Sequence, residues 1–398
     1  MLNEKITGKH GIFIAASFCA YFVLAIPLTV QGSIAPVTME YYGINAAQQG
    51  LIMTMQSIGS LGAGVFLALL GERYNKINVV AIGILIISII GATIAAIPTY
   101  IILLLLVIVM GVGNAIIDIM MNSVITDVYP KQKNTLLPFV HGFFSTGATV
   151  VPIIVTRIVE PTIPASFSYP FRVLAITAAA IFALFFISGR RIKADTPYID
   201  MEATRKRATA NPAEIFKTKT AWFFIVVGIL YFTFQVGIMM WLPTFAIRNV
   251  GADFETAGMM LTAFFGGSLV MRFLGPLLLR KLTAHQVFTY FGWASAISMF
   301  VALFSNNITL MLVLVVVSGF LQGSNVATLV LMCGEAFPGR TASAASIYAL
   351  ANNIVVLTTP LWMGVLSEYT GFLFPLAAVC VSLLVSSTLV FFHGRKLT

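Results

Sequence analysis

The sequence predicts an all-α membrane protein with twelve transmembrane helices in two pseudo-symmetric six-helix halves. The 398 residues are 59% apolar and only 9% charged, with a mean hydropathy of +0.96, far outside the range of an ordinary globular domain. Apolar windows of about 17 to 25 residues recur, the length that a helix needs to cross about 30 Å of hydrocarbon. One long polar interval divides these windows into six and six. Strands of alternating polarity are absent, so we expect helices and not a barrel.

The first six windows form the predicted N-terminal half, residues 1–188. The stretch MLNEKITGKHG and the apolar run behind it are similar to a signal peptide, but eleven further windows follow and no small-x-small cleavage pattern stands out. We therefore interpret this run as the first span. The six spans are expected near 11–35, 48–70, 77–97, 100–124, 137–159 and 170–188.

The polar interval at 189–220 is the predicted cytoplasmic linker, because it is the longest polar stretch and carries a dense cluster of basic residues. Behind it lies the C-terminal half, residues 221–398. Its spans are expected near 221–243, 257–279, 285–305, 308–334, 342–366 and 373–393.

The net charge of +9 follows the expected membrane topology. With the N-terminus inside, all of the 23 Lys and Arg fall on one side except Arg157, Arg172, Arg248 and Arg272. This positive-inside bias predicts a multi-pass plasma membrane protein, in the inner membrane of a bacterium, with both termini in the cytoplasm. Because topology explains the basic residues, no nucleic-acid partner is expected.

The two halves contain a similar segment after their second spans, in which a helix end is followed by a basic turn and a new apolar helix. These segments are ALLGERYNKINVV at 68–80 and GPLLLRKLTAHQV at 275–287. Such paired halves are typical of transporters built from repeats. The first copy resembles the signature Gly-x-x-x-Asp-Arg-x-Gly-Arg of the major facilitator superfamily. This resemblance implies the major facilitator fold, with a cytoplasmic gate motif formed by Glu72, Arg73 and Lys76.

A narrower resemblance links the chain to the fucose/proton symporter branch of that superfamily, which carries sugars. GVGNAIIDIMMN supplies the branch's Gly-x-Gly run, acid and Asn in the fourth span, with Asp118 and Asn122. YFTFQVGIMMWLPTF keeps the Tyr and the Trp-Leu-Pro-Thr of the seventh span. Two positions depart from the branch, since Gln235 replaces an acid in the seventh span and Gly32 stands where the first span of the fucose symporter has one.

Asn114, Asp118 and Asn122 are spaced four apart, which places them on one face of a helix. An ionised acid at mid-helix costs about 2.5–3.5 kcal/mol on insertion scales, unless it is protonated or faces an aqueous cavity. A group that changes its protonation in this way suits proton coupling, which we assign to Asp118. The alternative is a structural carboxyl that hydrogen-bonds neighbouring helices. Asp127, at the helix end, is expected to be an interfacial charge.

Four further polar residues share faces in pairs, Tyr231 with Gln235 and Gln322 with Asn325. The resemblance implies that the first, fourth, seventh and tenth helices line a cavity, where amides and a phenol suit a hydroxyl-bearing substrate. Interhelical hydrogen bonding is the alternative for each of them. The substrate-binding candidates are completed by Asn114, Asn122, Trp241, which could stack on a sugar or anchor at the interface, and Gln31 near the outer end of the first span.

Two other polar side chains within spans have competing interpretations. Arg272 is expected to snorkel or to pack at a gate, with substrate contact as the alternative. His141 is expected to pack, with a proton relay as the alternative. The chain shows no nucleotide-binding loop, nucleophile–His–acid set or metal-ligand spacing, so we expect no enzyme activity, no cofactor and no metal.

These observations predict a secondary active transporter that moves a small polar solute, most simply a monosaccharide, by proton symport. The alternative is an exporter of drugs or amphipathic compounds from the same superfamily, and a sensor built on a transporter fold is a rival of another class. The expected partners are the solute, a proton or sodium ion and the lipid bilayer, and the protein is expected to be monomeric. The identity of the solute, the direction of transport and the choice between proton and sodium stay open.

Overall fold

The computed structural model describes residues 8–70, 74–195, 216–337 and 341–393. Over these residues the chain is helical without any strand, and twelve helical segments are long and apolar enough to cross a membrane. The prediction of an all-α membrane protein with twelve spans is confirmed. The reason is the strong hydrophobicity of each window, because in lipid a backbone can satisfy its polar groups alone only as a helix.

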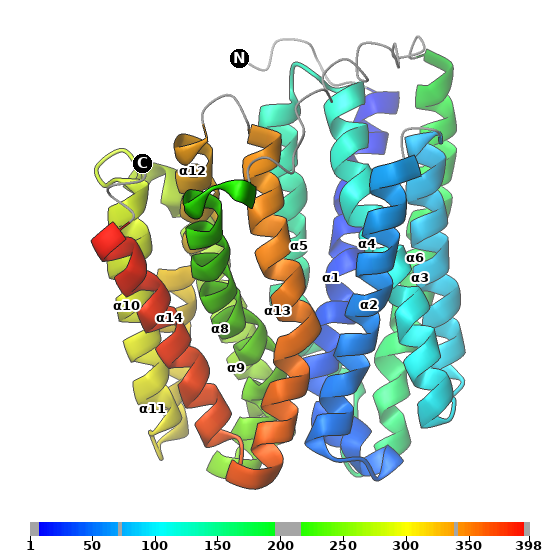
Figure 1. Cartoon of the computed structure of the whole chain (residues 1–398). Helices are drawn as coiled ribbons and strands as arrows, with labels where there is room; N and C mark the ends of the chain where they lie inside the picture. The colour runs from blue at the N-terminus through cyan, green and yellow to red at the C-terminus, as the bar shows by residue number, and fades with distance from the viewer. Residues whose placement is uncertain (1–7, 71–73, 196–215, 338–340, 394–398) are drawn as a thin grey trace. The chain divides into compact units, whose positions relative to one another are not determined.

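Most of the N-terminal spans run a few residues beyond the apolar windows. A side-chain cap begins α3, where Asn75 accepts a hydrogen bond from the backbone N–H of Asn78 over 3.1 Å. Figure 1 traces the elements in chain order: α1 (Lys9–Tyr42), α2 (Ala46–Leu70), α3 (Lys76–Ala95), α4 (Tyr100–Val128), α5 (Lys133–Ile158), the 3-10 helix η2 (Pro164–Ser168) and α6 (Tyr169–Asp195).

Capping residues also mark the ends of C-terminal spans. Thr218 caps the start of the first of them, and Gly251 ends it with a φ of 72°, in the left-handed region that glycine adopts without strain. The elements are α8 (Lys219–Val250), α9 (Phe254–Leu278), α10 (Ala284–Leu303), α11 (Ile308–Gln322), α12 (Asn325–Ala336), α13 (Thr341–Thr370) and α14 (Leu373–His393).

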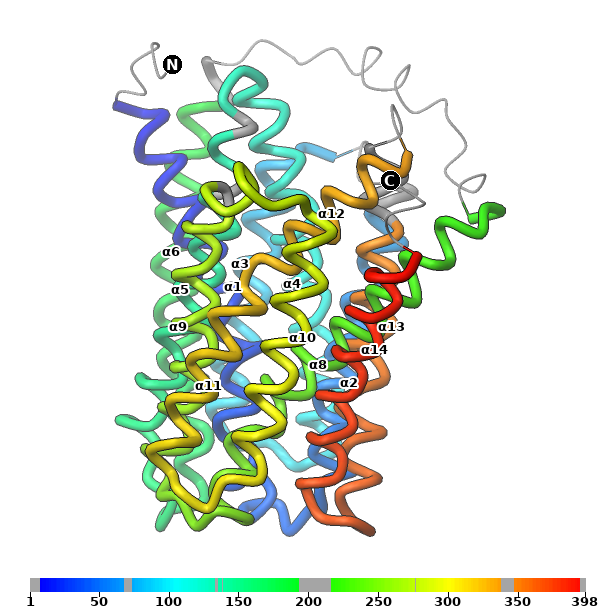
Figure 2. The backbone as a smooth tube through the Cα atoms, turned by 90° about the vertical axis from the view of Figure 1, so that its left-hand side faces the viewer, coloured from blue at the N-terminus to red at the C-terminus, as the bar shows by residue number. Residues whose placement is uncertain are grey.

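The tenth span differs from the continuous helix expected over 308–334, because it breaks into α11 and α12 at Gly323 and Ser324. The two pieces follow one another along the same path (Figure 2). A Cβ on Gly323 would lie 2.9 Å from the Cα of Ser268 in α9, so the break coincides with a close backbone approach. Ser324 makes no side-chain cap, and the start of α12 is left without one. Broken membrane helices are a feature of transporter binding sites.

The chain forms two compact units. The first takes in the described parts of 1–30, 55–148 and 165–209, and in it α3 packs on α4 and α6. The second takes in the described parts of 31–54, 149–164 and 210–398, and in it α8 packs on α13 and α14. The division into halves at 189–220 stays a prediction.

Within the second unit, the first turns of α2 pack closely on α13. The Thr54 hydroxyl donates to the carbonyl of Leu357 over 2.9 Å. Glycine allows the backbones to touch, because a Cβ on Gly50 would overlap the carbonyl oxygen of Pro360. The carboxylate of Glu368 accepts from the first backbone N–H of α2, over 2.5 Å, and so satisfies one of its terminal donors.

Candidate functional site

In the first unit, the carboxylate of Asp118 is exposed within the spanning helix α4. The Tyr21 hydroxyl of α1 donates to its Oδ1 over 3.0 Å and also reaches its backbone carbonyl at 3.1 Å. Tyr21 itself is almost completely buried. The acid is thus accessible and is also held by a buried donor. This environment suits a group that exchanges protons better than it suits a structural carboxyl, which would be buried between helices.

His141 of α5 extends this group. Its ring meets the Tyr21 ring edge to face with centroids 5.2 Å apart, and its side chain is exposed. Three helices therefore bring an acid, a phenol and an imidazole together around Tyr21. No spacing pattern in the sequence identified Tyr21, because a single tyrosine in an apolar span looks like ordinary packing material.

The two asparagines that flank Asp118 lie on the same helix as expected but differ in environment. The Asn122 amide donates to the backbone carbonyl of Asp118 over 2.6 Å, so its donor is engaged locally. Asn114 is buried, and neither of its amide atoms has a hydrogen-bond partner among the residues described. Because leaving buried polar atoms unpaired is costly, a ligand or water would restore more hydrogen bonding at Asn114 than at Asn122.

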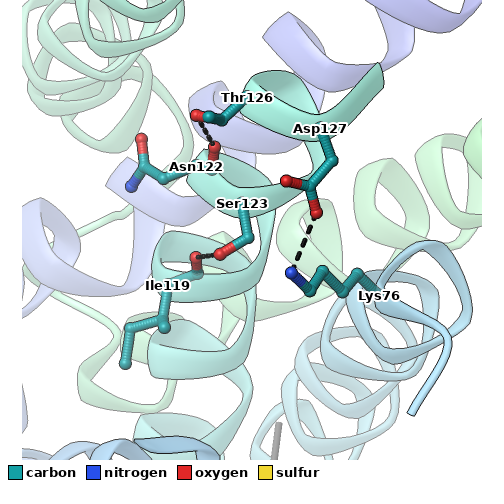
Figure 3. A network of polar contacts seen from close by, with 6 residues as sticks. All are labelled: Lys76, Ile119, Asn122, Ser123, Thr126 and Asp127. Atoms are coloured by element: carbon teal, nitrogen blue, oxygen red, sulfur yellow. Dashed lines mark hydrogen bonds and ion pairs between the residues drawn. The ribbon is translucent and has the colours of Figure 1, made fainter. Parts of the chain in front are cut away.

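About one turn after Asn122, α4 forms an ion pair with the start of α3. Nζ of Lys76 donates to Oδ2 of Asp127 over 2.8 Å in a half-buried ion pair, and the neighbouring turn is closed by Thr126, which donates to the carbonyl of Asn122 (Figure 3). Lys76 was assigned to the gate motif, and this pair gives it an anchoring contact within the first unit. Glu72 and Arg73, the other two members of that motif, lie outside the described residues.

Next to this ion pair, the α4 terminus also contacts α1. Nδ1 of His10 lies 3.1 Å from the hydroxyl of Tyr129, the residue that follows α4. Partial burial raises the pKa of that hydroxyl well above its usual range. The phenol therefore stays protonated at any physiological pH.

In the second unit, a buried polar chain connects three helices. The Tyr231 hydroxyl of α8 donates to Oε1 of Gln322 in α11 over 2.8 Å, and Nε2 of Gln322 donates to the Ser268 hydroxyl of α9 over 3.4 Å. Two of these residues were expected from the sequence, whereas Ser268 was not. Arg272 lies one turn from Ser268 on α9.

The remaining candidates occupy different environments. Gln235 is half-buried and has no hydrogen-bond partner in the described part of the chain, so its amide is available. Asn325 is fully buried, and its Nδ2 lies 3.2 Å from where a Cβ on Gly292 would be, beside Ser387. It therefore faces α10 and α14, whereas Gln322 bonds to α8 and α9.

The C-terminal halves of α1 and α8 contain the last two candidates. Gln31 is buried in α1. Trp241 is fully buried and packs on Phe372 with ring centroids 5.3 Å apart, so in this conformation it is neither an exposed stacking platform nor an interfacial anchor.

Gly32 shows why this chain has no acid at that point of α1. A Cβ there would overlap the carbonyl oxygen of Met239 in α8, so the two backbones touch within the second unit. Any side chain would force them apart. The described residues also contain no group of three or more His, Cys, Asp or Glu that could hold a metal ion.

Comparison with known proteins agrees with this architecture. The Major Facilitator Superfamily profile matches residues 17–292 and 245–397. The Protein TsgA homolog of Erwinia tasmaniensis is 22% identical over 320 residues, covering 79% of this chain and 77% of that protein. Inner membrane transport protein YdiM of Escherichia coli is 22% identical over 330 residues, covering 81% and 79%.

Two solved structures share the fold. A D-xylose-proton symporter superposes with a TM-score of 0.76 at 14% identity, covering 96% of this chain and 98% of that one. The nucleoside transporter NupG superposes with a TM-score of 0.74 at 14% identity, covering 98% and 99%. Because the family profile spans most of the sequence and these folds match over nearly its whole length, the chain belongs to the Major Facilitator Superfamily, a family of membrane transporters.

Proposed function

We propose that this transporter moves a small polar solute, a monosaccharide in the first instance, across the inner membrane by alternating access and proton symport through Asp118. The observation that carries the proposal is the exposed carboxylate of Asp118 within a membrane span, held by the Tyr21 hydroxyl. An accessible acid at this depth can take up and release a proton, and its charge has a large energetic effect there.

The geometry around Asp118 offers a way to link the proton to the solute. The Tyr21 hydroxyl contacts both Oδ1 and the backbone carbonyl of Asp118. When the carboxyl gains a proton, the phenol can remain on the carbonyl, while the carboxylic O–H becomes a donor that is free to bind a solute hydroxyl. Protonation would then favour solute binding, which is the differential affinity that symport requires.

Neutral hydrogen-bonding groups in the second unit suit an uncharged solute that carries hydroxyls. The Gln235 amide has no partner among described residues and can both donate and accept, and the bonded pair of Tyr231 and Gln322 can exchange partners. The resemblance to the fucose/proton symporter branch and the shared fold of a D-xylose-proton symporter point the same way. YdiM, described as an inner membrane transport protein, supports the proposed membrane.

A thermal-shift screen of the purified protein tests the solute class. A ligand that binds only the folded protein adds about 2.7 kcal/mol to its stability at a hundred times its Kd. We expect stabilisation by one or more monosaccharides, polyols, sugar acids or nucleosides. Stabilisation by amphipathic drugs alone would contradict the proposal and favour the exporter.

Uptake into proteoliposomes tests the coupling. With the bound solute in radiolabelled form, an imposed pH gradient, acid on the side from which the solute enters, should drive accumulation above the equilibrium level. Accumulation that requires a sodium gradient and does not respond to the pH gradient would show that the coupling ion is sodium and not the proton. Equilibration without accumulation under either gradient would indicate facilitated diffusion.

A further inference from the structure

A cluster of buried polar side chains lies in the second unit where α12 begins, distinct from the polar chain of Tyr231 and Gln322. There α10 packs on both α12 and α14. Four side-chain atoms have no hydrogen-bond partner among the residues described: Oγ1 of Thr289 in α10, Oδ1 and Nδ2 of Asn325 in α12, and Oγ of Ser387 in α14. None of the three residues is more than 1% exposed. Because each such atom is costly to bury alone, the cluster calls for a further hydrogen-bonding group.

Gly292 of α10 is the point at which two of these side chains meet. A Cβ on it would overlap the Ser387 hydroxyl and would lie 3.2 Å from Nδ2 of Asn325. The two groups thus approach one position on α10 from two other helices, and they do not bond to each other. Because a hydrogen bond spans about 2.7–3.2 Å, a single water molecule can reach both.

Thr289 lies on the same face of α10 as this meeting point. The face contacts α14 at His285, whose Nε2 donates to the carbonyl of Val390 over 2.6 Å, and again at Gly292, where the Ser387 hydroxyl approaches. Thr289 is four residues after His285 and three before Gly292, so it lies between these two contacts. Its hydroxyl is therefore on the side of α10 that carries the cluster.

Rotation of the side chains would not satisfy the cluster. A hydroxyl can donate to the carbonyl four residues earlier in its own helix, as Thr388 does to Leu384 over 2.8 Å. The Asn325 amide carries both a donor group and an acceptor, so a bond to its own helix would still leave Oδ1 without a donor. A buried water donates and accepts, and it makes about three hydrogen bonds to groups that otherwise lack partners.

The chemistry of the cluster favours a neutral occupant over an ion. Its side chains are two hydroxyls and one amide, without a charge among them. A cation would be attracted to the oxygens but repelled by Nδ2 of Asn325, and an anion would be repelled by Oδ1. Water complements both atoms of the amide at once.

We propose that Asn325, Ser387 and Thr289 hold one ordered water, which bridges the start of α12 to α10 and α14. This water attaches α12, whose first turn has no side-chain cap, to the rest of the second unit directly after the break in the tenth span. The inference gives Asn325 a structural role in place of solute contact. It does not depend on the transported solute or on proton coupling.

A double-mutant cycle on the full chain, purified in detergent, tests the bridge. Ser387→Ala should lower the unfolding temperature, because it leaves the water and its other partners one bond short. In an Asn325→Leu background the same change should have a smaller effect, because the shared water is already lost. If the Ser387 hydroxyl is simply unpaired, Ser387→Ala should raise the unfolding temperature or leave it unchanged in both backgrounds, which would overturn the proposal.

Ser386→Ala is the matched control. Ser386 is the neighbouring serine on α14 and is equally buried, but its hydroxyl donates directly to the carbonyl of Val227 over 2.9 Å. Its replacement should lower the unfolding temperature by the same amount with Asn325 or with Leu at position 325. If Ser386→Ala depended on residue 325 as strongly as Ser387→Ala does, the coupling would be general and the bridge would be refuted.

A crystal structure of the full chain that resolves ordered waters separates a water from the other occupants. We expect one density peak within hydrogen-bond distance of both Nδ2 of Asn325 and Oγ of Ser387. A direct bond between these two atoms would overturn the proposal. So would stabilisation by sodium chloride over choline chloride that Ser387→Ala abolishes, because a cation would then occupy the site.

Discussion

The Tyr21 hydroxyl of α1 donates to Oδ1 of Asp118 in α4 over 3.0 Å, and this bond joins a buried phenol to an exposed acid within a membrane span. Hydrogen bonds to charged groups contribute about 1.5–3 kcal/mol. The bond therefore holds the carboxylate of Asp118 in place, and Tyr21 acts on the proposed proton carrier without being one.

Replacing Tyr21 by Phe removes this donor and keeps the ring. We expect gradient-driven uptake to fall, because the carboxylate of Asp118 loses the donor that holds it in place. Tyr74→Phe is the control, because Tyr74 is exposed and lies outside the helices. Unchanged gradient-driven uptake by a stable Tyr21→Phe protein would remove Tyr21 from the coupling group.

Gly32 should tolerate no side chain. Gly32→Ala would push the backbones of α1 and α8 apart at Met239, and overpacking of this kind costs about 1–3 kcal/mol. The unfolding temperature should fall, whereas Gly62→Ala should leave it nearly unchanged, because a Cβ at Gly62 meets no atom within 4 Å. Equal effects of the two substitutions would show that the contact at Met239 is not decisive.

The spans were predictable because each is a long apolar window, and lipid leaves such a window few alternatives to a helix. The break at Gly323 was not, because Gly and Ser within an apolar run give no signal unless the approach of Ser268 is known. Asp118 could be proposed as a functional residue from the sequence, because an ionised acid is energetically costly within a membrane span. Tyr21 and Ser268 were missed because their roles depend on which helix faces them, and that depends on tertiary packing.

Gln235 and Asn325 should now behave differently. Gln235→Ala should weaken ligand binding by about 1–3 kcal/mol with little change in unfolding temperature, because its amide has no partner among the described residues. Asn325→Ala should weaken affinity less than Gln235→Ala does, since the Asn325 side chain is fully buried and faces Gly292 and Ser387. Isothermal titration with the solute found by screening measures both. The reverse pattern, with Asn325 decisive and Gln235 silent, would relocate the binding site.

The membrane orientation can be tested by cysteine labelling. A cysteine at Ala208, within the basic linker, should react with an impermeant maleimide only in inverted vesicles, because clustered Lys and Arg oppose translocation. A cysteine at Asn306, an exposed residue between α10 and α11, should react in intact cells. Labelling of the Ala208→Cys protein from outside would reverse the proposed topology.

Asp118→Asn tests the proposed proton coupling most directly. The amide keeps the shape of the protonated carboxyl but cannot titrate, so the pH gradient has no group there through which to bias the two conformations. In proteoliposomes, exchange of labelled for unlabelled solute should persist, because that cycle never requires the proton to leave, while accumulation driven by a pH gradient should vanish. A structural carboxyl predicts loss of both modes together with a lower unfolding temperature. Full gradient-driven accumulation by a stable Asp118→Asn protein would contradict the account.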